Sequence, residues 1–227
     1  GSLAMAGQPL NGTYTIDSAT VTGGTNFQSF QDLTDSLENN GVSGAVTVNV
    51  KVGSGPYSGQ VVLPEVKGAG AKSTITINGN GETVSNTASE SVFLFDGADY
   101  YTLDNIRIES KGTSNGTRCI HLWKKADYNT VKNCELVISE YTGTSNSTQY
   151  VSFSGSTTSY SSSADHGSYN TFDNNKMGNG TGDKSGAGPY HGICDYRNSS
   201  LTSTGFNKFT NNEIRDVYYY DIFLYYV

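Results

Sequence analysis

Tyr100-Tyr101-Thr102-Leu103-Asp104-Asn105-Ile106-Arg107-Ile108 recurs three more times along the chain, and this repeat is the strongest indication of the fold. The later copies begin at Tyr128, Tyr169 and Phe206 and end at residues 136, 177 and 214. Each copy has an aromatic residue first, an apolar residue fourth, an Asn sixth and an apolar residue ninth, and the starts are 28, 41 and 37 residues apart. Such a period is typical of solenoids, with loops of variable length between the stacked repeats.

A second apolar segment precedes each copy, and a fifth closes the chain. Apolar residues alternate in each segment as they do in a half-buried strand. If the repeats stack, these segments pair in parallel about 4.8 Å apart. We therefore predict an all-β fold, a right-handed parallel β-helix, with strands at Val92–Phe95, Ile120–Trp123, Val151–Ser154, Ile193–Tyr196 and Ile222–Tyr225.

The sixth residue of every copy is an asparagine. We expect Asn105, Asn133, Asn174 and Asn211 to lie above one another at a turn, because Asn tolerates left-handed backbone angles. Their amides would hydrogen-bond along the stack and satisfy buried backbone groups. This interpretation is structural and requires no ligand.

The N-terminal part predicts a cap for the solenoid. Residues Phe27 to Leu37 form an amphipathic pattern with Phe30 and Leu33 on one face, and Thr25 or Asn26 is the expected N-cap. We assign residues 1–7 to a cloning remnant and residues 8–227 to one β-helix domain, with the cap at about 8–45. No equivalent cap follows at the other end, so we expect the domain to be truncated there.

Composition excludes several function classes. Charged residues make up 15% of the chain, there are 27 glycines, and the net charge is −7, which disfavours both a helical bundle and nucleic-acid binding. No apolar segment approaches the roughly 20 residues that cross a bilayer, so membrane insertion is not expected. At least one of the three cysteines must be unpaired, and we expect free thiols or at most one disulfide. No motif predicts a metal or a cofactor.

The N-terminal half also resembles a known group of proteins. The residues that carry the resemblance are Asn11–Ile16, Phe30–Leu33, Gly41–Val50, Gly70–Ile77 and Asp99–Ile106. They are similar to right-handed β-helix domains of large exported bacterial surface proteins, which share their fold with pectate-lyase-like enzymes. The resemblance implies a secreted or cell-surface location. Many members are suspected adhesins or glycan-associated proteins, but the group has no common catalytic motif to transfer.

Alternation along the second strand predicts one outward row that is rich in aromatic residues. Flat rings at regular spacing could stack on sugars, so we predict ligand contacts from this row. The alternative is that the Ser-rich segment 139–165 lies over the rings and buries them. The aromatic residues of the row are Phe95, Trp123, Tyr196 and Tyr225.

Acid–base chemistry has one candidate cluster. His191, Asp195 and Arg197 follow a glycine-rich segment, and His166 could join them from the preceding loop. His121, Lys124, Asp127 and Asp165 are further candidates. The alternative is that these residues are ordinary acid–base neighbours on the surface.

Two functions remain open from the sequence. One is a non-catalytic exported surface or adhesin module that binds an extracellular polysaccharide or acts as a rigid spacer. The alternative is a polysaccharide lyase or glycoside hydrolase, so the sequence leaves open whether the chain is an enzyme. We also expect end-to-end self-association through residues 214–227, because the last apolar segment would present an unpaired edge.

Overall fold

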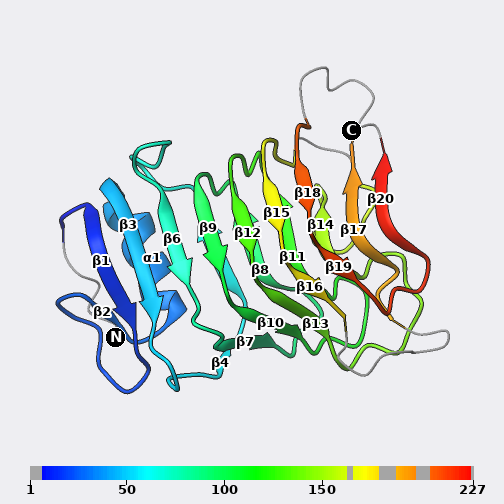
Figure 1. Ribbon diagram of the computed structural model, residues 1–227, viewed down its shortest axis with the longest axis horizontal. Helices are drawn as coiled ribbons and strands as arrows, with labels where there is room; N and C mark the ends of the chain where they lie inside the picture. The colour runs from blue at the N-terminus through cyan, green and yellow to red at the C-terminus, as the bar shows by residue number, and fades with distance from the viewer. Residues whose placement is uncertain (1–6, 163–165, 179–187, 198–204, 226–227) are drawn as a thin grey trace.

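The chain folds into three parallel β-sheets that wind around one core, as a computed structural model shows for residues 7–162, 166–178, 188–197 and 205–225 (Figure 1). Each strand pairs in parallel with the equivalent strand one rung away. The described residues contain a single helix. The predicted fold class is therefore confirmed: the chain is an all-β parallel solenoid with a short N-terminal helix.

Three sheets, which we name A, B and C, share the strands among them. Sheet A contains β2 (Asn26–Phe27), β1 (Leu10–Ile16), β3 (Val42–Val50), β6 (Ile75–Asn78), β9 (Tyr101–Asp104), β12 (Thr130–Lys132), β15 (Thr171–Asp173) and β18 (Lys208–Thr210). Sheet B contains β4 (Tyr57–Ser58), β7 (Thr83–Asn86), β10 (Arg107–Ser110), β13 (Glu135–Ile138), β16 (Lys176–Met177) and β19 (Glu213–Ile214). Sheet C contains β5 (Val61–Pro64), β8 (Ser91–Asp96), β11 (Arg118–Trp123), β14 (Gln149–Phe153), β17 (His191–Tyr196) and β20 (Tyr220–Tyr225).

The nine-residue repeat forms the corner between sheets A and B. Its fourth residue points into the core from sheet A, where Leu103 pairs with Val131 and Val131 with Phe172. Its ninth residue does the same from sheet B, where Ile108 pairs with Leu136. These positions are almost fully buried, apart from those in the last rung. The copies identified in the sequence are thus stacked in register.

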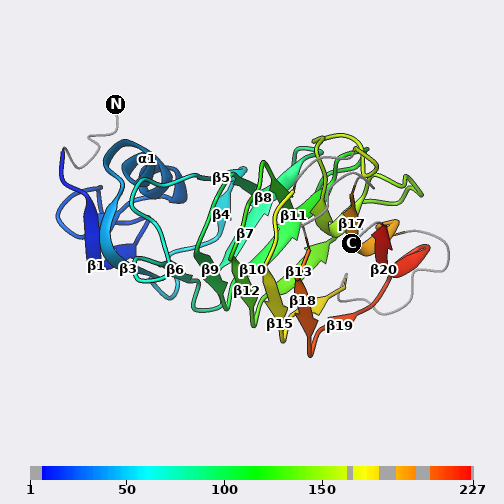
Figure 2. The same cartoon turned by 90° about the horizontal axis from the view of Figure 1, so that it is seen from above.

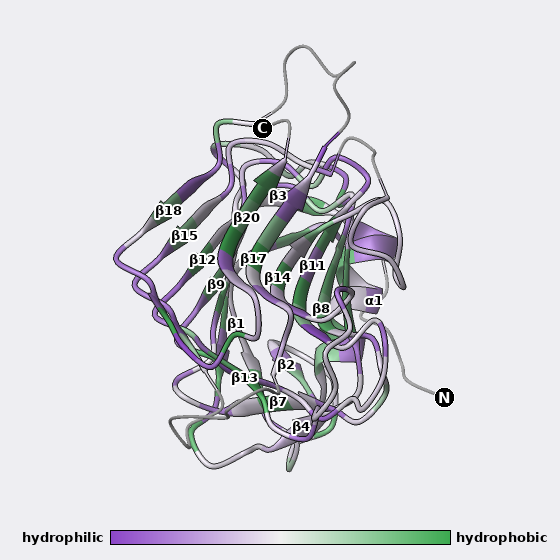
Figure 3. Ribbon diagram, turned by 90° about the vertical axis from the view of Figure 1, so that its right-hand side faces the viewer, coloured by the Kyte–Doolittle hydropathy of each residue, from purple (hydrophilic) through white to green (hydrophobic). Residues whose placement is uncertain are grey.

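Apolar side chains form one buried cluster along the described part of the solenoid. Figure 3 shows the hydrophobic residues of the surrounding strands in green. In sheet C the inward row runs through Leu63, Phe95, Leu122 and Phe153. Burial of such rows from water is the main stabilising contribution, about 25 cal/mol for each Å² of apolar surface. The row ends differently, because Asp195 and Leu224 occupy the next two positions.

The helix α1 (Phe30–Asn40) begins three residues later than the pattern predicts. Ser29 is the N-cap, and its side chain accepts a hydrogen bond from the Asp32 amide at 3.1 Å. The expected N-cap Asn26 is instead part of β2, where its side chain accepts a hydrogen bond from Thr15 Oγ1 at 2.7 Å. Pairing in β2 therefore takes precedence over the N-cap role that local chemistry predicted for Asn26.

Helix α1 closes the N-terminal part of the core beside β5 (Figure 2). The Phe30 ring packs edge-on against Tyr57 and Phe93, with ring centroids 5.2 and 6.0 Å apart. Leu33 and Leu37 are fully buried on the same face. This packing agrees with the predicted role of the helix as a cap.

The expected asparagine stack exists, but it lies in solvent. Asn105, Asn133, Asn174 and Asn211 all have left-handed backbone angles, with φ between 53° and 55°. Asn174 Nδ2 donates to Asn133 Oδ1 at 2.8 Å, and Asn133 and Asn211 donate to aspartates of the preceding rung. The prediction that these amides satisfy buried backbone groups is wrong, because their partners are exposed side chains.

Other asparagines serve the buried backbone between rungs. Asn170 Oδ1 accepts from the Asn129 amide at 2.9 Å, and Asn170 Nδ2 donates to the Ala126 carbonyl at 2.9 Å. Asn129 makes the same two bonds one rung earlier, to the Tyr101 amide and the Ala98 carbonyl. Asn175 repeats the arrangement at the second turn, so side chains replace backbone partners where the strands end.

Aromatic residues occupy left-handed backbone positions in four successive rungs. Tyr100, Tyr128, Tyr169 and Phe206 have φ between 57° and 61°, which costs about 1–2 kcal/mol for each residue other than Gly. Their rings stack in three pairs, and a stacked pair contributes about 0.5–1.5 kcal/mol beyond its buried area. Ring stacking therefore offsets at least part of the backbone strain.

All three cysteines are free and buried, as expected from the sequence. Burial raises the pKa of Cys134 and of Cys194 to about 12, and it raises the pKa of Cys119 as well. The thiols are therefore protonated and unreactive in the folded chain.

Candidate functional site

The outward face of sheet C carries the predicted aromatic row, although its register differs in one strand. Trp123 pairs with Asp96, and Tyr196 pairs with Tyr225. Phe95 pairs instead with Leu122 in the core and is 0% exposed. The expected outward position of Phe95 is therefore wrong, and Asp96 takes its place in the row.

The error arises from the first half of the strand. Val92, Phe93, Leu94 and Phe95 are all buried, so hydrophobic alternation does not reveal which of them point inward. The pairing of Phe93 with Ile120 shows that Phe93 and Phe95 lie in the inward row, whereas Leu94 does not belong to the core cluster. A one-residue shift of this kind exchanges the two faces of a strand.

Trp123 is half-buried between two neighbours. The His121 ring stacks parallel to it, with centroids 5.9 Å apart and planes at 9°. Lys124 Nζ lies 4.9 Å from the centroid of the indole ring, a cation–π contact, and it also binds Asp96 at 2.7 Å. This ring therefore offers less free face to a ligand than its place in the row suggests.

The segment 154–162 covers the middle of the face. The guanidinium of Arg118, on β11, donates hydrogen bonds to the carbonyls of Ser156 and Ser159 at 2.9 and 3.2 Å. The His121 ring nitrogen Nε2 lies 2.7 Å from the Ser154 carbonyl. Desolvation under this segment lowers the pKa of His121 to about 3, so the imidazole is neutral. The alternative that the 139–165 segment covers the row therefore applies to its central part.

Beyond that segment the face opens into a continuous aromatic surface. Tyr196 stacks on Tyr225 at 4.7 Å, and Tyr160 meets Tyr196 edge-on at 5.8 Å. Tyr225 and Tyr219 are 39% and 57% exposed. We name this surface the terminal aromatic patch; its members are linked ring to ring and are Tyr160, Tyr190, Tyr196, Tyr218, Tyr219, Tyr220, Phe223 and Tyr225.

Two tyrosines of the patch hold their protons more tightly than a free tyrosine does. A hydrogen bond with Tyr219 raises the pKa of Tyr220, and burial raises the pKa of Tyr160. His191 lies under the patch, with its ring 5.3 Å from Tyr160 and 5.0 Å from Phe223. Desolvation lowers the pKa of His191 to about 4, so it is a neutral imidazole.

The predicted catalytic cluster is divided between the core and the outer face. Asp195 binds Arg197 at 3.0 Å, and His166 Nδ1 lies 3.7 Å from its other carboxylate oxygen. The three side chains are at most 2% exposed, because Asp195 occupies an inward position of β17. His191 lies at the opposite end of β17 and pairs with Gln149 and Tyr220. The cluster is thus a buried ion pair between Asp195 and Arg197 with His166 beside it. His191 lies apart from it.

The further candidates are also separate from one another. His121 is buried under the covering segment, and Lys124 is bound to Asp96. The Asp127 carboxylate accepts a hydrogen bond from the Ser168 amide at 2.6 Å. Asp165 lies outside the described residues.

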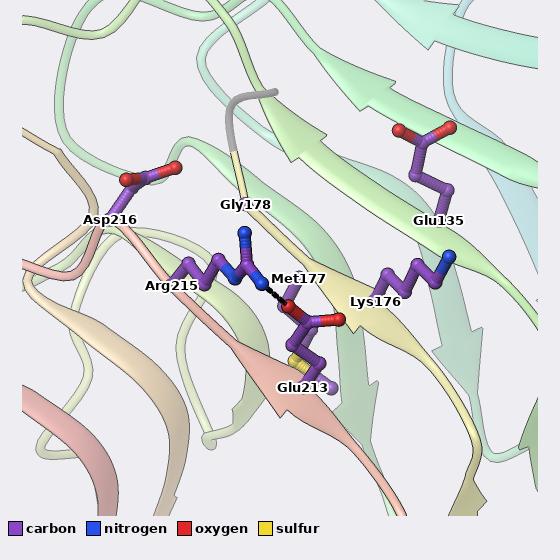
Figure 4. Close-up of a pocket in the computed structure, with 7 residues that line it drawn as sticks. All are labelled: Glu135, Lys176, Met177, Gly178, Glu213, Arg215 and Asp216. Atoms are coloured by element: carbon purple, nitrogen blue, oxygen red, sulfur yellow. Dashed lines mark ion pairs between the residues drawn. The ribbon is translucent and has the colours of Figure 1, made fainter. Parts of the chain in front are cut away.

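Sheet B forms a second open site that the sequence interpretation missed (Figure 4). It has a volume of about 300 Å³ and is lined by Glu135, Lys176, Met177, Gly178, Glu213, Arg215 and Asp216. Glu135, Lys176 and Glu213 are adjacent in register across three strands. Arg107, Glu135, Lys176 and Glu213 are the eighth residues of the four repeats, a signal that was visible in the sequence.

The charges of this pocket alternate from rung to rung. Arg107 binds Glu135 at 2.5 Å, and Arg215 forms an ion pair with Glu213. Opposite charges on neighbouring strands stabilise a sheet, whereas like charges destabilise it. Both glutamates are therefore already engaged with arginines, and the alternation alone explains their presence.

The part of the chain that the structure describes has neither a membrane-spanning helix nor a cluster of metal-binding side chains. No helix there is long and apolar enough to cross a membrane. No group of three or more His, Cys, Asp or Glu side chains converges there in a way that could hold a metal ion.

Comparisons of this sequence with protein-family models, with curated proteins and with solved structures found no match.

Proposed function

We propose that the chain is a non-catalytic module of an exported surface protein and that it binds an extracellular glycan through the terminal aromatic patch. The observation that carries the proposal is the concentration of exposed tyrosines on one face of the last two rungs. Large exposed aromatic patches on soluble proteins usually mark binding surfaces. The resemblance to β-helix domains of bacterial surface proteins supports the exported location.

The chemistry of the patch suits a sugar. A tyrosine ring offers an apolar face to the C–H groups of a pyranose, and its hydroxyl can exchange hydrogen bonds with sugar hydroxyls. Seven of the eight members are tyrosines. Since none of the members is a lysine or an arginine and the imidazole of His191 beneath them is neutral, we expect an uncharged glycan rather than a polyuronate.

The scaffold favours binding with little loss of entropy. Tyr196, Phe223 and Tyr225 project from paired strands, and each ring is in contact with at least one other ring. Rings held in place before binding lose little rotamer freedom when a ligand arrives. Their rigidity also agrees with an adhesin or spacer, in which shape must be maintained.

A glycan array followed by calorimetry with the best ligand tests the proposal. We expect Tyr225→Ala to weaken binding about tenfold, which corresponds to about 1.4 kcal/mol. Tyr128→Ala is the matched control, because Tyr128 is similarly exposed but lies outside the patch. If the array shows no ligand, or if both variants bind like the parent chain, the glycan proposal fails and the rigid spacer remains.

The alternative function, a polysaccharide lyase or glycoside hydrolase, has its best support in the sheet B pocket. Glu135 and Glu213 are two strands apart in one row, about 9.6 Å between backbones. Inverting hydrolases hold their two carboxyl groups about 6.5–9.5 Å apart, slightly less than this backbone separation, so the two side chains would have to lean toward each other. Release of reducing ends or of unsaturated sugars from a polysaccharide panel, abolished by Glu213→Gln, would favour the enzyme over the binding module.

A further inference from the structure

The four strained aromatic residues form a second exposed surface that the proposed function does not use. Tyr100, Tyr128, Tyr169 and Phe206 each lie just before a strand of sheet A, namely β9, β12, β15 and β18. These strands lie side by side in Figure 1. The centroids of successive rings are 5.0, 4.9 and 5.1 Å apart, and the planes of neighbouring rings are within 9° of parallel. We name this array the aromatic ladder.

The ladder presents its edges to solvent rather than its faces. Stacking occupies the ring faces, yet Tyr128 and Tyr169 are each 45% exposed and Phe206 is 68% exposed. The exposed rims form a continuous apolar strip, which a flat aromatic molecule can cover with dispersion contacts and exclusion of water. A flat aromatic molecule that lies along the solenoid axis can therefore meet several rims at once.

The backbone at these positions strengthens the case for a role in binding. An Asn or Gly would adopt the left-handed conformation with less strain, and Asn does so at the opposite end of the same strands. An aromatic residue at such a position therefore has a backbone cost that ring stacking must first offset. Residues held in strained conformations are concentrated at functional sites, so the repeated use of an exposed aromatic residue here needs an explanation.

Carboxylates flank the ladder and define the charge of its ligand. Asp99 and Asp127 immediately precede Tyr100 and Tyr128, and both contribute to raising the pKa of the Tyr128 hydroxyl. The negative charge of Glu65 likewise contributes to raising the pKa of Asp99. Lys124, which is close in sequence, is paired with Asp96. The negative charge beside the rings complements a cation.

We propose that the aromatic ladder binds extended, planar aromatic cations, with their long axis parallel to the solenoid axis. The four rings span about 15 Å, which matches two or three fused or linked aromatic rings. Each ring of the ligand would lie across the rims of neighbouring rungs, with its positive charge near Asp99 and Asp127.

Thioflavin T is a suitable probe, because it is flat, elongated and cationic. Fluorescence titration on the full chain, in a fraction shown by ultracentrifugation to be free of aggregates, should give saturable binding. Tyr128→Gly should weaken this binding at least tenfold. Glycine adopts the required backbone angle without strain, so the variant loses the ring and keeps the turn. Tyr128→Phe should bind like the parent chain.

Two controls separate this site from the others. Tyr219→Ala removes an exposed ring of the terminal aromatic patch and should leave dye binding unchanged, whereas Asp99→Asn with Asp127→Asn should weaken it and reduce its salt dependence. Full binding by Tyr128→Gly, or equal loss in Tyr219→Ala, overturns the ladder site. Glycan binding is measured separately with Tyr225→Ala, so failure of one proposal does not decide the other.

Discussion

Asparagine side chains at neighbouring positions of this chain bind different partners: some bind buried backbone groups and others bind exposed side chains. Asn170 is buried and bonds both to the Asn129 amide and to the Ala126 carbonyl, which lie in the same turn of the preceding rung. Asn174, four residues later, is exposed and bonds to the side chain of Asn133. Sequence periodicity favoured Asn174 because it recurs in every copy, but burial decides which residue the fold depends on.

We expect Asn170→Ala to lower the free energy of unfolding by about 2–4 kcal/mol, because it leaves a buried amide and a buried carbonyl without partners. Asn174→Ala should cost less than about 1 kcal/mol, since water can replace its exposed partner. Urea denaturation of the two variants measures the difference. Equal losses would contradict the assignment of the structural role to the buried asparagines.

The raised pKa of Asp99 predicts that the stability of the fold depends on pH. Burial raises its pKa to about 6, above the value of about 3.9 in an unfolded chain. The native state therefore holds the proton more tightly, and ionisation destabilises it as pH rises from 4 through 6. Asp99→Asn should remove this dependence and raise the melting temperature at pH 7.5. Parallel pH profiles of parent and variant would contradict the prediction.

At the scale of the strand, β8 shows what alternation alone does not determine. Phe95 is buried in the core, whereas the sequence pattern placed it on the outer face. The ambiguity comes from four consecutive buried residues, whose faces are set by the pairing of Phe93 with Ile120. Strands β11, β14, β17 and β20 have polar or aromatic residues on the outer face, and their rows were predicted in the correct register.

Phe95→Ala tests the corrected register. A fully buried phenylalanine replaced by alanine costs about 3–5 kcal/mol, whereas an outward ring would cost less than about 0.5 kcal/mol. Chemical denaturation of the variant gives the value. Leu94→Ala is the comparison, because Leu94 lies on the outer side of the same strand.

The fold was predictable because the repeat places its apolar residues at the same positions in every copy. Leu103, Val131 and Phe172 occupy one row, as their shared fourth position implies. The candidate cluster was less predictable, since Asp195 points into the core at a position that is apolar in the other rungs. Sequence spacing brought His191 and Asp195 together, but four residues of extended strand separate them in space.

At the scale of the whole molecule, the two ends of the described solenoid differ. Helix α1 closes one end, while β18, β19 and β20 are the outermost strands of their sheets at the other. Ile222 and Leu224 hold inward positions, yet both are 46% exposed. Apolar side chains beside unpaired strand edges favour pairing with another chain.

We therefore keep end-to-end self-association through residues 214–227 as a proposal for this chain. Sedimentation velocity over a range of concentrations should reveal dimers, and Leu224→Lys should shift the distribution to monomer. In a verified monomer, hydrogen exchange should be faster in 216–225 than in 118–136, because the last rung has one neighbour. Equal protection in the two segments would contradict the proposal.

Parallel pairing between rungs also has a mechanical consequence. The hydrogen bonds that join one rung to the next run along the solenoid axis, so tension on the chain ends would open them one after another, as in a zipper. Each detached rung releases its own length of chain, at about 3.5 Å for each residue. The repeat starts are 28, 41 and 37 residues apart. An optical trap should record unequal steps of about 100, 140 and 130 Å, which would give the order in which the rungs peel away.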